Sequence, residues 1–267
     1  MEALAWARLH GAPTAAPEVV SDRPWALVTR LGDVWLKECR PVQRHEVPLT
    51  VALAARWPDR VPGVLAADAA NGRLLLEDAG APVAAFGDEL AAWTAALPLY
   101  AELQQGETEH TAAHLAAGVP DLRPHTLPAR YDAWVDREPR LAPFARRLAE
   151  LCGALELPPT VQHDDLHSAN LYARSGRITI LDWGDTCIAH PLTSVFILFR
   201  VAEHFHGPDW LPTLRAAYAE PWGDVGEELG VAYVVGAFSR LLQWERMNEP
   251  EQLERNLEWF LENVVAA

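Results

Sequence analysis

Residues 161–185 read VQHDDLHSANLYARSGRITILDWGD, and the polar cluster 162–170 at their start is the densest in the chain. Two short apolar runs follow, 171–173 and 178–181, with the pair Ser175-Gly176 between them. Such a pattern predicts a small β-hairpin that has polar residues on both sides. Carboxylates so close to apolar strands are costly to bury unless they are paired or bind a metal ion.

Phosphoryl transfer gives these polar side chains a use. Asp165 and Asn170 are five residues apart, as in the kinase pattern D-x-x-x-x-N, and Asp182 lies on the far side of the predicted hairpin. One carboxylate can accept the proton of a hydroxyl, while an amide and a second carboxylate hold Mg²⁺ through oxygen, the ligand type that this ion prefers. The spacing therefore indicates a kinase-type site.

The segments His163-x-Asp165-x-x-x-x-Asn170 and Leu181-Asp182-Trp183-Gly184 resemble the signature of the aminoglycoside phosphotransferase and choline kinase families. The resemblance implies an α+β, protein-kinase-like two-lobe fold with a β-rich N-lobe and a mostly helical C-lobe. It also implies that ATP and Mg²⁺ are the cofactors. By this resemblance Asp165 is the catalytic base and His163 supports the backbone of its loop. Asn170 and Asp182 are then the metal ligands.

The resemblance reaches a second group of residues, in the N-terminal half. Lys37 matches the strand lysine that contacts the α- and β-phosphates, and a lysine flanked by apolar residues needs an anionic partner. Glu46, at the start of the next predicted helix, is the candidate for its paired glutamate, because Glu38 points to the opposite face of the strand. Backbone groups of Glu77 and Ala79, at the expected hinge, are candidates to bond adenine.

Three segments depart from the family pattern. The loop Ser21-Asp22-Arg23-Pro24 has no glycine, unlike the phosphate loop of protein kinases. The chain reads His163-Asp164-Asp165 where many relatives read His-Gly-Asp, which brings a second negative charge beside the base. The segment 190–194 reads His-Pro-Leu-Thr-Ser, where many relatives have Asp-Pro followed shortly by another Asp.

The rest of the chain divides into a β-rich half and a helical half. Turn residues separate β-prone runs at 19–20, 25–31, 34–39, 64–65 and 74–76, and a helix is predicted from about residue 46 to residue 57. Apolar residues at three- and four-residue spacing predict further helices at 89–104, 108–117, 127–152, 190–206, 211–220, 224–246 and 249–265. We therefore expect an N-terminal nucleotide-binding lobe at 1–76, a hinge at 77–82 and a catalytic and substrate lobe at 83–267, with the ligand where the lobes meet.

Composition limits the partners. The formal net charge of −15 disfavours nucleic acids and anionic membranes, and no apolar stretch is long enough to span a bilayer. The odd number of cysteines, three, and the lack of a signal peptide favour reduced thiols in a cytoplasmic protein. The expected partner is a small-molecule hydroxyl acceptor bearing an amine, such as an aminoglycoside, an amino sugar or a choline-like molecule. The sequence indicates no oligomeric state.

Two other classes of function remain open at this point. The glycine-free loop and the altered 190–194 segment are compatible with a catalytically weak, nucleotide-binding pseudokinase that has a regulatory role. Alternatively, His163, Asp165 and His167 could be ligands of a transition metal in a hydrolase, because alternate residues of an extended segment can face one ion. The hydrolase hypothesis leaves Lys37, Asn170 and Asp182 without a role.

Overall fold

The computed structural model describes residues 2–85 and 88–266. The chain forms two compact units, which are described separately. The first unit contains Met1–Ala96, Ala116–Val119 and Ser168–Asp185, and the second contains Leu97–Leu115, Pro120–His167 and Thr186–Ala267.

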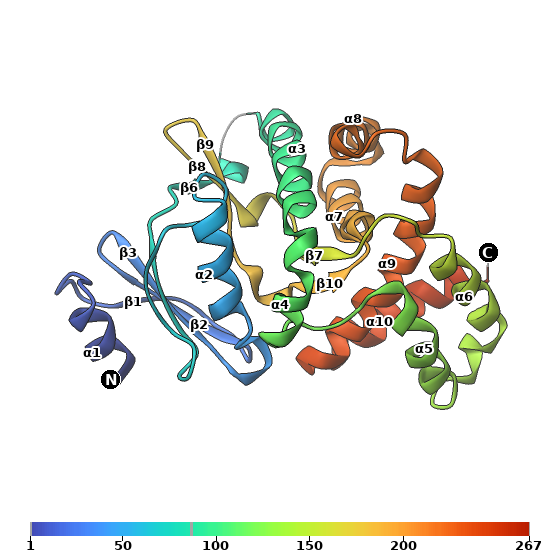
Figure 1. Cartoon of the computed structure of the whole chain (residues 1–267), viewed down its shortest axis with the longest axis horizontal. Coiled ribbons are helices and arrows are strands. Elements are labelled where there is room, and N and C mark those ends of the chain that lie inside the picture. The colour runs from blue at the N-terminus through green and yellow to red at the C-terminus, as the bar shows by residue number, and fades with distance from the viewer. Residues whose placement is uncertain (1, 86–87, 267) are drawn as a thin grey trace. The chain divides into compact units, whose positions relative to one another are not determined.

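A five-stranded antiparallel sheet in the order β1-β2-β3-β5-β4 forms the centre of the first unit (Figure 1). The strands are β1 (Glu18–Asp22), β2 (Ala26–Leu31), β3 (Val34–Cys39), β4 (Val64–Asp68) and β5 (Arg73–Glu77). The β-prone runs predicted at 19–20, 25–31, 34–39, 64–65 and 74–76 lie in these five strands or overlap them. Gly72 supplies the positive φ, 70°, that the turn between β4 and β5 requires.

Two helices cover the two faces of this sheet (Figure 1). The predicted helix that begins at residue 46 is α2 (Glu46–Arg56), and Val47 at its start packs against Leu74 of β5. On the other face, Leu36 and Leu75 pack against α1 (Glu2–Leu9), a short helix that the sequence analysis did not predict. Because side chains alternate along β3, burial of Leu36 towards α1 places Lys37 on the α2 face.

The predicted hairpin around Ser175-Gly176 is present as β8 (Leu171–Arg174) and β9 (Arg177–Ile180). A two-residue strand, β6 (Ala81–Pro82), adds to its edge by pairing with β8, so residues 81–82 are not merely a break between elements. Gly80 enables this pairing. Its φ is 99°, and a Cβ there would lie only 2.3 Å from the carbonyl oxygen of Ala173.

The second unit consists mainly of helices. It contains the C-terminal part of α3 (Glu89–Glu107), most of α4 (Thr111–Ala116), and α5 (Leu127–Val135), α6 (Ala145–Gly153), α7 (Val195–His206), α8 (Leu211–Ala219), α9 (Gly226–Met247) and α10 (Pro250–Phe260). A short antiparallel pair, β7 (Thr160–Gln162) and β10 (Cys187–Ala189), was not predicted. The single helix predicted over 127–152 is wrong, because a 3₁₀ segment that starts at Pro139 and contains Pro143 separates α5 from α6.

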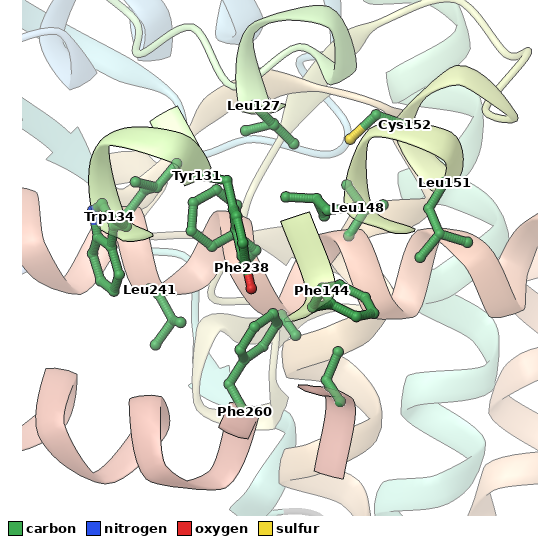
Figure 2. Packing of buried hydrophobic residues seen from close by; sticks show 14 of the residues in the cluster. Leu127, Tyr131, Trp134, Phe144, Leu148, Leu151, Cys152, Phe238, Leu241 and Phe260 are labelled. Atoms are coloured by element: carbon green, nitrogen blue, oxygen red, sulfur yellow. The ribbon is translucent and has the colours of Figure 1, made fainter. Parts of the chain in front are cut away.

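An aromatic core holds the helices of the second unit together (Figure 2). The Tyr131 and Phe238 rings meet edge to face with centroids 4.9 Å apart, and Phe144 meets Phe260 with centroids 6.0 Å apart. These residues come from α5, the 3₁₀ segment, α9 and α10, so α9 is anchored along much of its length. Within residues 2–85 and 88–266, no helix has both the length and the apolar character needed to cross a membrane.

Two glycines of α9 provide a test of this packing. A Cβ at Gly236 would lie 2.6 Å from the carbonyl oxygen of Thr193 and 3.1 Å from Cβ of Phe196, whereas a Cβ at Gly230 would meet nothing within 4 Å. Gly236→Ala should therefore lower the free energy of unfolding by about 1–3 kcal/mol. Gly230→Ala should raise it by roughly 0.5–1 kcal/mol, because alanine favours the helix. Urea unfolding followed by circular dichroism measures both, and equal shifts would contradict the close contact at Gly236.

Candidate active site

Lys37 is the only lysine of the chain, and it lies at the centre of a charged cluster in the first unit. Its ammonium nitrogen is 2.7 Å from Oε1 of Glu46 and 2.6 Å from Oδ1 of Asp182. The side chain of Lys37 is 8% exposed and that of Glu46 is 3% exposed, whereas Asp182 keeps 49% of its side-chain surface. The structure thus brings together three of the residues selected from the sequence, one of which comes from 145 residues further along the chain.

The charges in this cluster depend on one another. Burial opposes the charged form of Lys37, but the carboxylates of Asp182 and Glu46 outweigh it, so the pKa of the ammonium is raised. Burial also raises the pKa of Glu46, against the pull of Lys37. Cys39, on the same strand, donates its thiol to Oε2 of Glu46 over 3.4 Å and so contacts the second oxygen of that buried carboxyl.

Asn170 and Asp182 flank the open end of the hairpin. Leu171 pairs with Ile180 in the strand register, and the amide of Leu181 donates to the carbonyl of Asn170 at 2.9 Å. Asp182 adopts a left-handed backbone conformation, with φ at 62°, which few residues other than glycine, asparagine and aspartate tolerate. An amide oxygen and a half-exposed carboxylate at one end of a hairpin fit a hard, oxygen-binding cation such as Mg²⁺.

Gln43 supports the next residues of the motif, and the sequence analysis did not identify it. It lies in a 3₁₀ turn just before α2, is buried, and donates from Nε2 to Oδ1 of Asp185 at 2.9 Å. A Cβ at Gly184 would lie 2.4 Å from the Gln43 carboxamide. A side chain at residue 184 would therefore displace the Gln43 carboxamide from this position.

The segment expected to be the hinge is held within the first unit. The amide of Glu77 donates to the carbonyl of Gly63 at 2.9 Å, and Ala79 is buried. Asp78 between them accepts from the Trp35 indole at 3.1 Å through its side chain and from Arg174 at 2.9 Å through its carbonyl. Asp78 thus links this segment both to β3 and to the hairpin.

The predicted base and its loop lie in the second unit. The backbone amide of His163 donates to the hydroxyl of Tyr100 at 2.9 Å. Asp165 is 33% exposed at its side chain, and Nε2 of His167 lies 3.5 Å from its Oδ2. Burial would raise the pKa of Asp165, but His167 and the guanidinium of Arg240 outweigh it and hold that pKa below its ordinary value. Arg240 was not identified from the sequence.

The 190–194 segment, which departs from the family pattern, also contacts this loop. The hydroxyl of Ser194 bonds to Tyr100 at 2.8 Å and to the side chain of Gln162. His190 caps the segment by accepting from the amide of Leu192, and its other ring nitrogen lies 2.8 Å from Glu228. Hydroxyl, amide and imidazole groups thus support the loop at the segment where many relatives have aspartates.

The hydrolase hypothesis can be compared with the geometry. Among the residues that the structure describes, no group of three histidine, cysteine, aspartate or glutamate side chains is placed to hold a metal ion, so His163, Asp165 and His167 do not form the site that a hydrolase needs. Two tryptophans of the second unit, Trp244 and Trp259, face arginines. Arg240 lies 4.0 Å from the ring centroid of Trp244, and Arg200 lies 3.9 Å from that of Trp259.

Solved structures with a similar fold include aminoglycoside and macrolide phosphotransferases and a choline kinase. The GDP complex of aminoglycoside 2'-phosphotransferase-IIIa aligns with a TM-score of 0.67 and 16% identity, over 100% of this chain and 99% of that one. Choline kinase LicA from Streptococcus pneumoniae gives 0.67 and 11%, over 99% and 98%. Macrolide 2'-phosphotransferase MphH from Brachybacterium faecium gives 0.63 and 18%, over 95% and 94%.

These similarities confirm the predicted α+β, kinase-like fold. Comparison with curated protein sequences gives no match. A model of the phosphotransferase enzyme family, by contrast, matches residues 1–229, which include Lys37, Glu46 and the whole motif from His163 to Gly184. On that match, the chain belongs to the phosphotransferase enzyme family.

Proposed function

We propose that the protein is a small-molecule kinase that moves the γ-phosphate of ATP to a hydroxyl group, with Mg²⁺ as the metal. One observation carries this proposal: the buried Lys37 ammonium contacts Glu46 and Asp182 at 2.7 and 2.6 Å, and Asp182 lies beside Asn170 at the end of the hairpin. Phosphoryl transfer depends mainly on positioning and on charge stabilisation, and this cluster supplies both.

The first unit holds the nucleotide in this proposal. Lys37 gives its positive charge to the phosphates, and Glu46 keeps the ammonium in place from the buried side. The adenine bonds to the hinge backbone. Because the Glu77 amide is already donated to Gly63, the carbonyl of Glu77 and the amide of Ala79 are the groups proposed for adenine.

Asn170 and Asp182 hold the metal in this proposal. When bound, Mg²⁺ neutralises the negative charge that develops on the phosphoryl oxygens. Asp182 has two tasks, because one oxygen accepts from Lys37 while half of its side-chain surface remains exposed.

Asp165 of the second unit accepts the proton of the acceptor hydroxyl. Its depressed pKa keeps it ionised at neutral pH, and its partial exposure leaves room for a substrate oxygen. His163 fixes the loop backbone through its bond to Tyr100. Asp165 and Asn170 are five residues apart, so the chain can separate them by at most about 18 Å.

The proposed acceptor is a small hydroxylated molecule that carries an amine. A solved structure of this fold contains kanamycin, and another is a choline kinase. Acidic side chains of the second unit favour a cation over an anion, although Glu228 and Glu245 are already bonded to His190 and Arg137. Further acidic residues from α7 onward include Glu203, Asp209, Glu227, Glu249 and Glu251.

A panel of hydroxylated small molecules, scored for acceptor-dependent release of ADP in the presence of Mg²⁺, tests the proposed function. The panel should include aminoglycosides, amino sugars, choline-like amines and neutral sugars. Nucleotide binding without turnover on any acceptor would favour the pseudokinase alternative.

Lys37→Ala should raise the KM for ATP or lower turnover by at least about tenfold, which corresponds to about 1.4 kcal/mol, because the phosphates lose their buried cation. Arg8→Ala is the matched control: it removes one positive charge from the surface of the same unit, at an exposed residue of α1. Steady-state kinetics of both variants decide the matter. Unchanged kinetics of Lys37→Ala would remove this residue from the site.

Asp165→Asn and Asp182→Asn should fail in different ways. Asp165→Asn should bind Mg-ATP as tightly as the wild type and lose turnover, because only the proton acceptor is gone. Asp182→Asn should lose turnover and also the gain in ATP affinity that Mg²⁺ provides. Calorimetry with and without Mg²⁺ separates them, and equal Mg-ATP binding by both variants would show that the roles are assigned wrongly.

Ionic strength tests the charge of the acceptor. For an amine acceptor, raising salt from low to physiological concentration should increase its KM while changing kcat little, because salt screens the attraction over a Debye length of about 8 Å. A neutral member of the panel serves as the control, and its KM should not respond. A true acceptor without positive charge would refute the amine class and leave the kinase proposal standing.

A further inference from the structure

Arg240 is a buried cation in α9. Its side chain is 1% exposed, and its guanidinium lies 4.0 Å from the ring centroid of Trp244. A guanidinium that has left water is stable only with anionic and hydrogen-bonding partners. Its partners therefore indicate why the chain keeps an arginine there.

This guanidinium contacts two consecutive residues of the predicted catalytic loop. Nη1 of Arg240 donates to the carbonyl oxygen of Asp164 at 2.8 Å and lies 3.5 Å from Oδ2 of the same residue. Nη2 lies 3.4 Å from Oδ1 of Asp165. One cation thus contacts the backbone before the base, the carboxylate beside the base, and the base itself.

These contacts matter because of the backbone conformation and the burial of Asp164. Its φ is 58°, a left-handed conformation that stores strain in a residue with a side chain, and its own carboxylate is buried. The backbone of Asp164 sets the direction from which the side chain of Asp165 leaves the loop. A bond to the Asp164 carbonyl therefore fixes the position of Asp165, while the same guanidinium offsets the additional negative charge.

We propose that Arg240 is the positioning residue for Asp165: it holds the left-handed turn at Asp164 and keeps the Asp165 carboxylate in one orientation. This inference rests on the proposed function, in which Asp165 accepts the proton of the acceptor hydroxyl. The two oxygens of Asp165 then have separate surroundings, with Arg240 near Oδ1 and His167 near Oδ2.

The proposal has a consequence for pH dependence. The charged and titratable groups that face Asp165 are Arg240 from α9 and Asp164, His163 and His167 from its own loop. Arg240 and His167 favour the ionised carboxylate, whereas Asp164 opposes it. Activity needs the ionised form, so it is lost as the pH falls through the pKa of Asp165. Removal of Arg240 should raise that pKa and move the acidic limb of the profile to higher pH.

Arg240→Met and Arg240→Lys test the inference, with Arg200→Met as the matched control. Arg200 also stacks on a tryptophan of the second unit, at 3.9 Å from the ring centroid of Trp259, so its variant reproduces the loss of a stacked guanidinium elsewhere. Release of ADP from Mg-ATP is measured against pH, with the acceptor from the panel or, if there is none, with water. Calorimetry gives the Kd of Mg-ATP.

Arg240→Met should lower kcat by at least about tenfold at neutral pH and move the acidic limb up by about one pH unit. The Kd of Mg-ATP should stay within about twofold of the wild type, because the nucleotide residues belong to the first unit. Arg240→Lys should return the acidic limb towards its original position, since the charge is kept. It should restore kcat only in part, because an ammonium cannot contact both residues as a guanidinium does. Arg200→Met should match the wild type in all three measurements.

A double-mutant cycle tests the same contacts without catalysis. Asp165→Asn should cost less stability in the Arg240→Met background than in the wild type, as measured by the urea midpoint at neutral pH. The pKa of Asp165 is depressed in the folded protein, so this coupling is present above the unfolded pKa and is lost as the pH falls through the folded one. If the panel shows no phosphate transfer but the coupling is found, the proposed function fails while the Arg240–Asp165 interaction stands.

Three results would overturn the inference. They are additive effects of the two substitutions, an Arg240→Met enzyme with wild-type kcat and an unchanged acidic limb, and a loss of kcat accompanied by an equal loss of Mg-ATP affinity. The last result would mean that Arg240 only stabilises the fold. If Arg240→Met does not fold, Arg240→Lys decides by itself: reduced kcat with an unmoved acidic limb supports the inference, and wild-type kcat refutes it.

Discussion

A buried ammonium must have anionic partners, and that requirement on Lys37 organises the first unit. Its two carboxylates come from the start of α2 and from the end of the hairpin, 145 residues along the chain. Strand β3, helix α2 and the 168–185 segment must therefore converge on one point. The other contacts of this unit serve the same convergence: Gln43 bonds to Asp185, Asp78 links the hinge to β3, and β6 pairs with β8.

In the second unit, a buried arginine likewise lies beside two carboxylates. Consecutive carboxylates at Asp164 and Asp165 would repel each other near a buried loop, and Arg240 lies against both. The anchor of that arginine is α9, which the aromatic core around Phe238 holds in place. A helix that would otherwise be read as ordinary core thus brings a charge to the loop that carries the predicted base.

Local sequence patterns were sufficient for much of this description. The motif from His163 to Asp182 was recognisable because its spacing is short, and strand alternation was enough to exclude Glu38 as the partner of Lys37. Contacts between residues far apart in the sequence were not predictable in the same way. Arg240 lies 75 residues beyond Asp165 in a mostly apolar helix, and the three-residue pairing of β7 with β10 has no strong local signal. The break between α5 and α6 does have a local signal, Pro139 and Pro143, which the helix predicted over 127–152 did not take into account.

The solitary lysine has a practical consequence. Apart from the histidines, every other basic side chain is an arginine. A sample labelled with ¹⁵N only in lysine would therefore carry a single labelled side-chain ammonium group. That group lies between two carboxylates in a buried cluster. Its resonance needs no assignment, and slow proton exchange in such an environment favours its detection. Nuclear magnetic resonance can therefore follow the centre of the charged cluster through this one nitrogen, without any substitution in the protein.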